Sequence, residues 1–197
     1  MRPSLDDHAL DSLFREAHTA HGFLDEPVDP ATWRRLYDLL KWGPTSMNCQ
    51  PARYAFVTSL EAKSRLIPAL SEGNRDQTVQ AAATVIVATD TRFYEHLPTQ
   101  YPTSPNARER FAANPEKARE TALRNATLQG GYLILAARTL GLDVGPMSGF
   151  DNAMVDEEFF PDGRYQSNFL VNLGVADPRM TRPRAPRLAF EEVAEIL

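Results

Sequence analysis

The sequence has few of the features that accompany export, disulfide bonding or membrane insertion. Cys49 is the only cysteine among 197 residues, so no disulfide forms within the chain. No apolar run approaches the roughly 18 residues that a membrane-spanning helix needs. The first seven residues also lack the apolar core of a secretory signal. From these absences we expect a soluble, cytoplasmic protein with no membrane partner.

Several common site motifs are missing as well. The chain contains no G-x-G-x-x-G, no G-x-x-x-x-G-K-[ST] and no G-x-S-x-G, which argues against a Rossmann site, a P-loop and a hydrolase nucleophile elbow. Cys49 has no evident base partner, so we interpret it as a packing residue. His18 and His21 have a spacing that suits a metal, but no cysteine or acidic cluster supplies further ligands. We therefore predict no metal site.

Acidic residues outnumber basic ones, 26 to 21, which gives a formal net charge of −5. This balance argues against nucleic acid or an anionic membrane as the main partner. The hydrophobic content of 43% and the charged content of 24% are ordinary for a folded globular protein. No internal repeat or linker divides the chain, so we predict a single domain over residues 1–197.

Apolar periodicity predicts both helices and strands. Glycine and proline bound most of these segments, and Ser4 followed by Asp7 predicts the first helix cap. Gly130 and Gly131 interrupt the longest helix. Glycine there costs about 1 kcal/mol relative to alanine, so we predict that another helix packs closely, either inside one domain or at the seam of a dimer. Gly73-Asn74-Arg75 is predicted to break the chain before a short helix. We expect helices at 4–17, 29–42, 59–70, 76–81, 114–140 and after Asp151, strands at 53–58, 83–89 and 167–176, and an irregular segment at 91–114.

A polar loop between the second helix and the first strand is the strongest candidate site. Residues 42–51, W-G-P-T-S-M-N-C-Q-P, place two hydroxyls and two amides between two prolines. Amide and hydroxyl groups held in stiff turns suit directed hydrogen bonds to a heteroaromatic ring or a sugar-like chain. The residues alone support an ordinary polar loop equally well.

This loop resembles the A-P-S-x-x-N-x-Q-P signature of the nitroreductase family of FMN-dependent oxidoreductases. Residues 141–151, G-L-D-V-G-P-M-S-G-F-D, resemble the family's G-L-G-x-x-x-P-x-x-G-F-D, and 167–176 resembles its apolar strand ending in glycine. The resemblance covers nearly the whole chain. It implies an α+β nitroreductase-like fold with a central, mainly antiparallel sheet flanked by helices. It also implies that FMN binds at the interface of an interlocked homodimer.

The resemblance implies three groups of cofactor contacts. In the family an R-S-x-R-x-F motif holds the FMN phosphate, and this chain carries histidine at both arginine positions. Histidine is largely neutral at pH 7, so we expect nearby arginines to supply more of the charge, with Arg15 as a further candidate. An exposed basic tail is the alternative interpretation of residues 179–187. The expected contacts are the loop residues Pro44, Thr45, Ser46 and Asn48; the ring-side residues Pro146, Met147, Ser148 and Gly149; and the phosphate-side residues His18, Thr19, His21, Arg184 and Arg187.

Residues 41–53 and 141–151 resemble one branch of the family in particular, the malonic semialdehyde reductases of pyrimidine (uracil) breakdown. The resemblance implies hydride transfer from NADH or NADPH to N5 of FMN, and then to malonic semialdehyde in the same pocket, giving 3-hydroxypropionate. No catalytic side chain is assigned, because the cofactor carries the chemistry. Arg75 or Arg124 is a candidate for the substrate carboxylate, and the 91–114 segment for substrate choice. The alternatives are a broad nitroaromatic or quinone reductase and a flavin-binding protein without turnover.

Overall fold

The computed structural model describes residues 3–197. Two predictions depend partly on the first two residues: that the chain has no leader, and that the domain spans residues 1–197. For those two residues the predictions lie outside the described part. Within it, one antiparallel sheet has the strand order β1-β2-β4-β3, which confirms the predicted α+β architecture. The strands are β1 (Ala52–Val57), β2 (Ala83–Asp90), β3 (Asp143–Met147) and β4 (Tyr165–Gly174).

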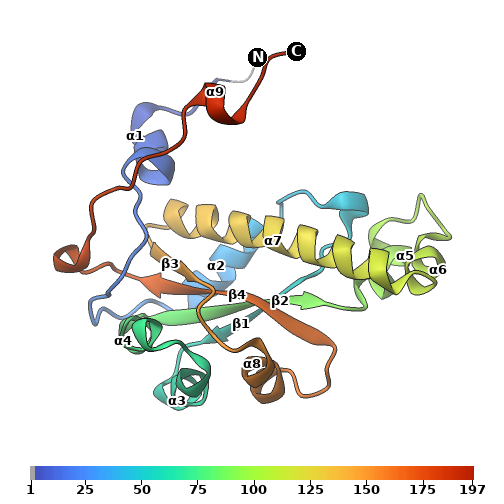
Figure 1. The fold of residues 1–197 in the computed structure, drawn as a ribbon, viewed down its shortest axis with the longest axis horizontal. Coiled ribbons are helices and arrows are strands. Elements are labelled where there is room, and N and C mark those ends of the chain that lie inside the picture. The colour runs from blue at the N-terminus through green and yellow to red at the C-terminus, as the bar shows by residue number, and fades with distance from the viewer. Residues whose placement is uncertain (1–2) are drawn as a thin grey trace.

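Helices cover both faces of this sheet, with α7 across one face and α3, α4 and α8 on the other (Figure 1). The helices are α1 (Asp7–Leu10), which continues into a π-helical turn at Asp11–Arg15, α2 (Ala31–Leu40), α3 (Leu60–Leu66), α4 (Glu72–Gln80), α5 (Leu97–Gln100), α6 (Ala107–Ala112), α7 (Pro115–Thr139), α8 (Asn152–Phe159) and α9 (Phe190–Val193).

Capping side chains start four of the helices in the described part, namely α1, α3, α7 and α8. Asp151 accepts a hydrogen bond from the Met154 amide at the start of α8, as predicted. At the first helix the predicted cap is wrong, because Asp6, rather than Ser4 with Asp7, accepts from the backbone. The predicted break at 73–75 is also wrong, since α4 begins at Glu72 and runs through it. Tertiary contacts hold this helix at both ends: the Asn74 amide donates to the Gly149 carbonyl, and the Lys63 ammonium donates to the Val79 carbonyl.

Strand β2 is buried along its whole length, as its apolar sequence predicts. Val85 and Val87 pack with α2 and α7 on one face of the sheet. Ile86 packs with α3 and α8 on the other face. Since both faces of β2 are covered, the sheet is the middle layer of three, and any site must lie at an edge or an end of the strands.

The two glycines of α7 have different surroundings. A β-carbon on Gly130 would lie 2.3 Å from Cζ of Phe169, a ring that β4 directs toward the helix. Gly131 faces open space. The predicted contact with another helix is therefore wrong at Gly130, where the close neighbour is an aromatic side chain of the sheet. Gly130 sets how near α7 lies to β4.

This contact predicts a clear difference between two glycine substitutions. Gly130→Ala forces the Phe169 ring or the helix to move, so we expect unfolding free energy to fall by about 1–3 kcal/mol in urea titrations. Gly73→Ala is the control, because Gly73 is also helical and nothing lies within 4 Å of its added β-carbon. We expect that variant to match or exceed the parent protein. Equal destabilisation by both changes would contradict the packing account.

Candidate functional site

A basic hollow of about 480 Å³ lies where the segment after α1, the end of α7 and the C-terminal tail meet. The structure brings together here all five of the residues predicted for the phosphate, although they come from opposite ends of the sequence. Two further arginines, Arg138 and Arg182, line the same hollow. We call this site the basic cradle, and its polar lining consists of His18, Thr19, His21, Arg138, Arg182, Arg184 and Arg187.

Backbone contacts hold the cradle together. Thr19 pairs with Val144 of β3, and the neighbouring Ala20 amide donates to the Val144 carbonyl at 2.9 Å. This approach needs Gly145, because a β-carbon there would lie 2.7 Å from the Ala20 carbonyl oxygen. The Arg184 guanidinium donates to the carbonyls of Arg15 and Ala17, each at 2.8 Å, and so ties the tail to the first segment.

The cradle concentrates positive charge, which the nearby Asp143 offsets only in part at Arg138. Within residues 3–197 its four arginines form no ion pair, and no carboxylate lines the hollow. Burial and the charge of Arg184 lower the pKa of Arg138, while burial and the charge of Arg182 lower the pKa of His21. Each of these shifts includes repulsion between cations, which an entering anion would relieve. The arrangement suits a phosphate group.

Two expectations about arginines change with the structure. Arg15 is bound by Asp7 and Asp11, at 2.7 and 2.6 Å, and does not line the cradle, so its predicted role is wrong. Arg138 was not predicted. A basic residue in the last turn of a long helix is common, because it interacts favourably with the negative end of the helix dipole. The sequence therefore has no signal that distinguishes a phosphate ligand from an ordinary helix-end arginine at this position.

The ring-side residues continue from the cradle along β3. Pro146 and Met147 end this strand, and Ser148 and Gly149 follow it, roughly 15 Å from Val144 at the strand rise per residue. The Met147 side chain is buried, so its backbone is the part that remains available. No hydrogen bond within residues 3–197 uses the backbone N–H of Ser148 or Gly149. These two donors are therefore open to a ligand.

Gly149 is held closely by α4. Its carbonyl accepts from the Ser71 amide and from Nδ2 of Asn74, both at 2.9 Å. A β-carbon on Gly149 would lie 2.7 Å from that same Asn74 nitrogen, so only glycine fits without rearrangement. The sequence does not identify Asn74 as a supporting residue, because Gly73-Asn74-Arg75 has the composition of a break rather than of a helix.

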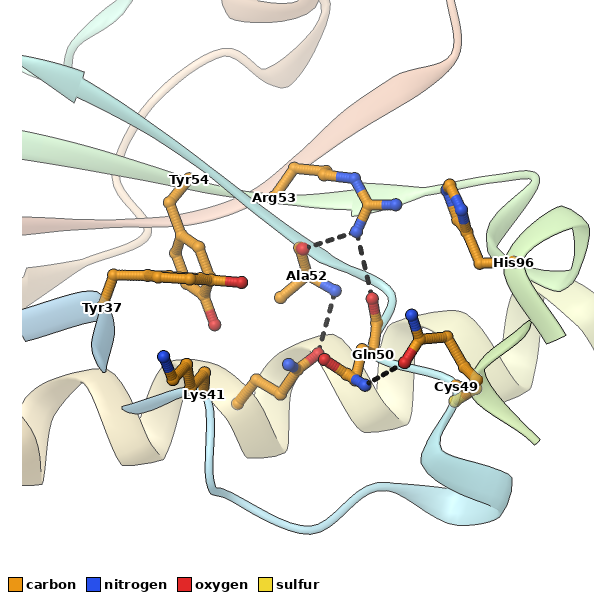
Figure 2. Close-up of a pocket in the computed structure, with 10 residues that line it drawn as sticks. Tyr37, Lys41, Cys49, Gln50, Ala52, Arg53, Tyr54 and His96 are labelled. Carbon is orange, nitrogen blue, oxygen red and sulfur yellow. Dashed lines mark hydrogen bonds between the residues drawn. The ribbon is translucent and has the colours of Figure 1, made fainter. Parts of the chain in front are cut away.

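The loop residues Pro44–Asn48 lie against α7 rather than against the cradle. The Ser46 amide donates to Oδ1 of Asn125 at 2.8 Å, and the Ala52 amide just beyond the loop donates to Oε1 of Gln129 at 3.0 Å. Nε2 of Gln50 donates to Oε1 of Gln100 at 3.0 Å. Figure 2 shows Gln50 beside Ala52 and Arg53, where the loop enters β1. The loop also holds non-glycine residues at positive φ, namely Met47, Asn48 and Gln50. Such backbone is costly and needs this surrounding support.

The loop and the cradle lie far apart within one chain. Asn125 supports the loop, whereas Arg138 lines the cradle. The two residues are thirteen positions apart on one continuous helix, or about 20 Å along its axis. The structure thus brings the phosphate-side and ring-side groups together along one strand. It does not bring the loop residues Pro44, Thr45, Ser46 and Asn48 to them.

The remaining sequence candidates lie outside these groups. Arg124 pairs with Glu120 on the exposed side of α7, and Arg75 donates to the Leu70 carbonyl. The 91–114 segment contains α5, near the short helix that Phe93, Tyr94 and Leu97 predict, and α6, and Phe93 within it is buried. Among residues 3–197, no group of three or more His, Cys, Asp or Glu is placed to hold a metal. No helix in the described part is long and apolar enough to cross a membrane.

Comparisons with known proteins extend this picture. The model of the nitroreductase family matches residues 15–175. A candidate NADH dehydrogenase/NAD(P)H nitroreductase of Stenotrophomonas maltophilia is 56% identical over 196 residues, which covers 100% of both chains. A candidate nitroreductase of Bacillus subtilis superposes with a TM-score of 0.87 at 22% identity, over 98% of this chain and 100% of that one. A candidate nitroreductase of Exiguobacterium sibiricum, crystallised with FMN, superposes with a TM-score of 0.84 at 20% identity, over 100% of this chain and 99% of that one.

The environment of Cys49 generates a prediction about reactivity. This thiol is buried beside Phe93, Ala118 and Ala122, and burial raises its pKa to about 11. At pH 8 about one thiol in a thousand is then ionised, and the reactive form of a cysteine is the thiolate. We expect labelling by a disulfide reagent to be slow in the native protein and complete after unfolding. Full labelling within seconds at pH 8 would contradict this.

Proposed function

Because this chain belongs to the nitroreductase family, we propose that it is an FMN-dependent oxidoreductase that takes electrons from NADH or NADPH. The observation that carries the proposal is the basic cradle, where four arginines surround a hollow that no described carboxylate lines. Phosphate is the part of FMN that such a site recognises. The FMN complex of a protein with the same fold supports this choice of cofactor.

The chain would hold FMN at two places along β3. Arg138, Arg184 and Arg187 would bind the phosphate together with His18, Thr19 and His21, and the backbone of 146–149 would lie along the ring. Bound FMN supplies hydride transfer through N5. The open N–H groups of Ser148 and Gly149 would donate to the edge of the ring, where preorganised donors favour the reduced form. No side-chain nucleophile is required.

The proposal includes a homodimer, with residues 1–197 of each copy acting as one domain. The polar loop lies about 20 Å from the cradle of its own chain, and a second copy would bring its own loop to the cofactor at this cradle. The tail beyond β4 runs past α1 and away from the sheet (Figure 1). It exposes a series of large apolar side chains, which a partner subunit would cover. These are Leu188, Phe190, Val193, Ile196 and Leu197.

For the electron acceptor we propose malonic semialdehyde, reduced to 3-hydroxypropionate in pyrimidine degradation. The support is the resemblance of residues 41–53 and 141–151 to that branch of the family. A broad nitroaromatic or quinone reductase is the second candidate, and the name of the 56% identical relative favours it. A flavin-binding protein without turnover is the third alternative, for which the histidines in place of arginines are the support.

The role of the cradle predicts which part of the cofactor each variant affects. Arg138→Gln and Arg187→Gln each remove a positive charge, so we expect FMN affinity to fall about tenfold. Riboflavin lacks the phosphate, and its affinity should not change. Arg119→Gln is the matched control, because Arg119 lies on α7 outside the cradle. Both affinities can be measured by flavin fluorescence quenching. A parallel loss of FMN and riboflavin affinity would contradict a phosphate site.

The substrate proposal is tested by comparing kcat/KM for malonic semialdehyde, a nitroaromatic and a quinone, with NADH and with NADPH. We expect the aldehyde to have the highest value. If it is poorest by orders of magnitude, malonic semialdehyde is wrong and the broad reductase takes its place. If FMN binds but neither nicotinamide bleaches its absorption band anaerobically, the protein binds flavin without turnover.

A further inference from the structure

The basic cradle contains two histidines beside its four arginines. His18 and His21 both line the hollow and are half-buried. No hydrogen bond or ion pair within residues 3–197 uses a ring nitrogen of either histidine. Arginine stays charged throughout the physiological range, whereas histidine changes its charge between about pH 5 and pH 8. The cradle therefore combines a permanent positive charge with a charge that depends on pH.

Backbone contacts fix the positions of the two histidines. Between them, Thr19 pairs with Val144 of β3, and the Ala20 amide donates to the Val144 carbonyl at 2.9 Å. Just after them, the Gly22 carbonyl accepts from the Asp177 amide at 3.0 Å. Both rings are thus held at the cradle by hydrogen bonds to the segments on either side of it.

The charged groups that face the histidines across the hollow are cations. Arg138 comes from the end of α7, and Arg182, Arg184 and Arg187 come from the tail. Burial and the charge of Arg182 lower the pKa of His21 from its ordinary value of 6.5. At pH 7 and with no anion nearby, this ring is therefore mainly neutral.

The carboxylates of the neighbouring segments do not compensate these cations from inside the hollow. Asp143, at the start of β3, accepts from a backbone amide at 2.8 Å. Asp177 is bound by Arg179 at 2.6 Å, and Glu16 is exposed. None of the three lines the hollow. The group that would favour protonated histidines is therefore an anion from outside the chain.

We propose that binding of the FMN phosphate in the basic cradle is coupled to uptake of a proton from solvent by His18 and His21, so that the protein holds FMN more tightly at pH 6.5 than at pH 8. A phosphate dianion beside an imidazole favours its charged form. By linkage, affinity rises as pH falls wherever the complex binds more protons than its free components. Below about pH 6 the phosphate itself takes up a proton, so the effect is confined to higher pH. The inference rests on the proposed function, because FMN supplies the phosphate.

The sign of the pH dependence follows from His21. Its pKa is low without the anion and rises with the anion bound. The added affinity is therefore present below the raised pKa and is lost as pH increases through it. Arginine at the same positions would give no such dependence, because it stays charged.

Flavin affinity of the full-length protein at pH 6.5, 7.2 and 8.0, measured by fluorescence quenching in phosphate-free buffers, tests the coupling. We expect FMN to bind about fivefold more tightly at pH 6.5 than at pH 8.0. Riboflavin, which lacks the phosphate, should change little. Calorimetry of FMN binding at pH 7.2, in two buffers with different ionisation enthalpies, should show net proton uptake. Equal FMN affinity at all three pH values, or no proton uptake, would overturn the inference.

Two double variants assign the effect to the histidines. His18→Gln with His21→Gln keeps polar side chains that do not titrate, so FMN should bind with the same, weaker affinity at all three pH values. His18→Arg with His21→Arg should bind FMN tightly at each pH. His8→Gln is the control, because His8 is exposed on α1 outside the cradle, and it should retain the pH dependence.

The outcomes separate this inference from the proposed function. A pH dependence that persists in the double glutamine variant would belong to another group and would overturn the inference alone. The same holds if the parent protein binds FMN equally well at every pH. If the parent protein binds no FMN at any pH, the proposed function fails and the coupling fails with it.

Discussion

The distance between α7 and β4 is the constraint on which the other features of the site depend. Gly130 sets that distance, because the Phe169 ring occupies the space where a side chain would be. With the helix held there, its C-terminal end places Arg138 in the basic cradle. Its middle directs Asn125 and Gln129 to the backbone around the polar loop, and its first turns line a cavity beside Thr89. A shift of this one helix would change all three regions.

Charge is compensated at the end of β2 and left uncompensated in the basic cradle. Asp90, at the end of β2, is fully buried and bound by Arg53 at 2.6 Å and Arg164 at 3.1 Å, so its charge is compensated within the protein. A paired, buried carboxylate of this kind stabilises one arrangement of the strand ends. In the cradle the arginines lack such a partner. The ion pairs around Asp90 therefore stabilise the fold, whereas the arginines of the cradle are suited to bind an anion from outside the chain.

The separation of the loop from the cradle connects the fold to assembly. Both are well supported, the loop by buried amides of α7 and the cradle by backbone contacts to β3. Neither support allows a movement of about 20 Å, because α7 is one continuous helix. In the proposed dimer the loop of one copy and the cradle of the other would meet at one cofactor, so the proposed dimer and the proposed flavin site depend on each other.

By itself, the sequence determined the main elements and the family. Apolar runs and caps located β2, α2, α8 and the long α7 closely, because such signals are local in the chain. The motifs at 42–51 and 141–151 also identified the residues that the structure groups near β3 and against α7. What only the tertiary structure decided depends on contacts between distant residues. These contacts are the placement of Arg138 beside His18, the passage of α4 through Gly73 and the Phe169 ring over Gly130. The periodicity of the sequence does not predict these contacts, because each depends on where two separate segments meet in space.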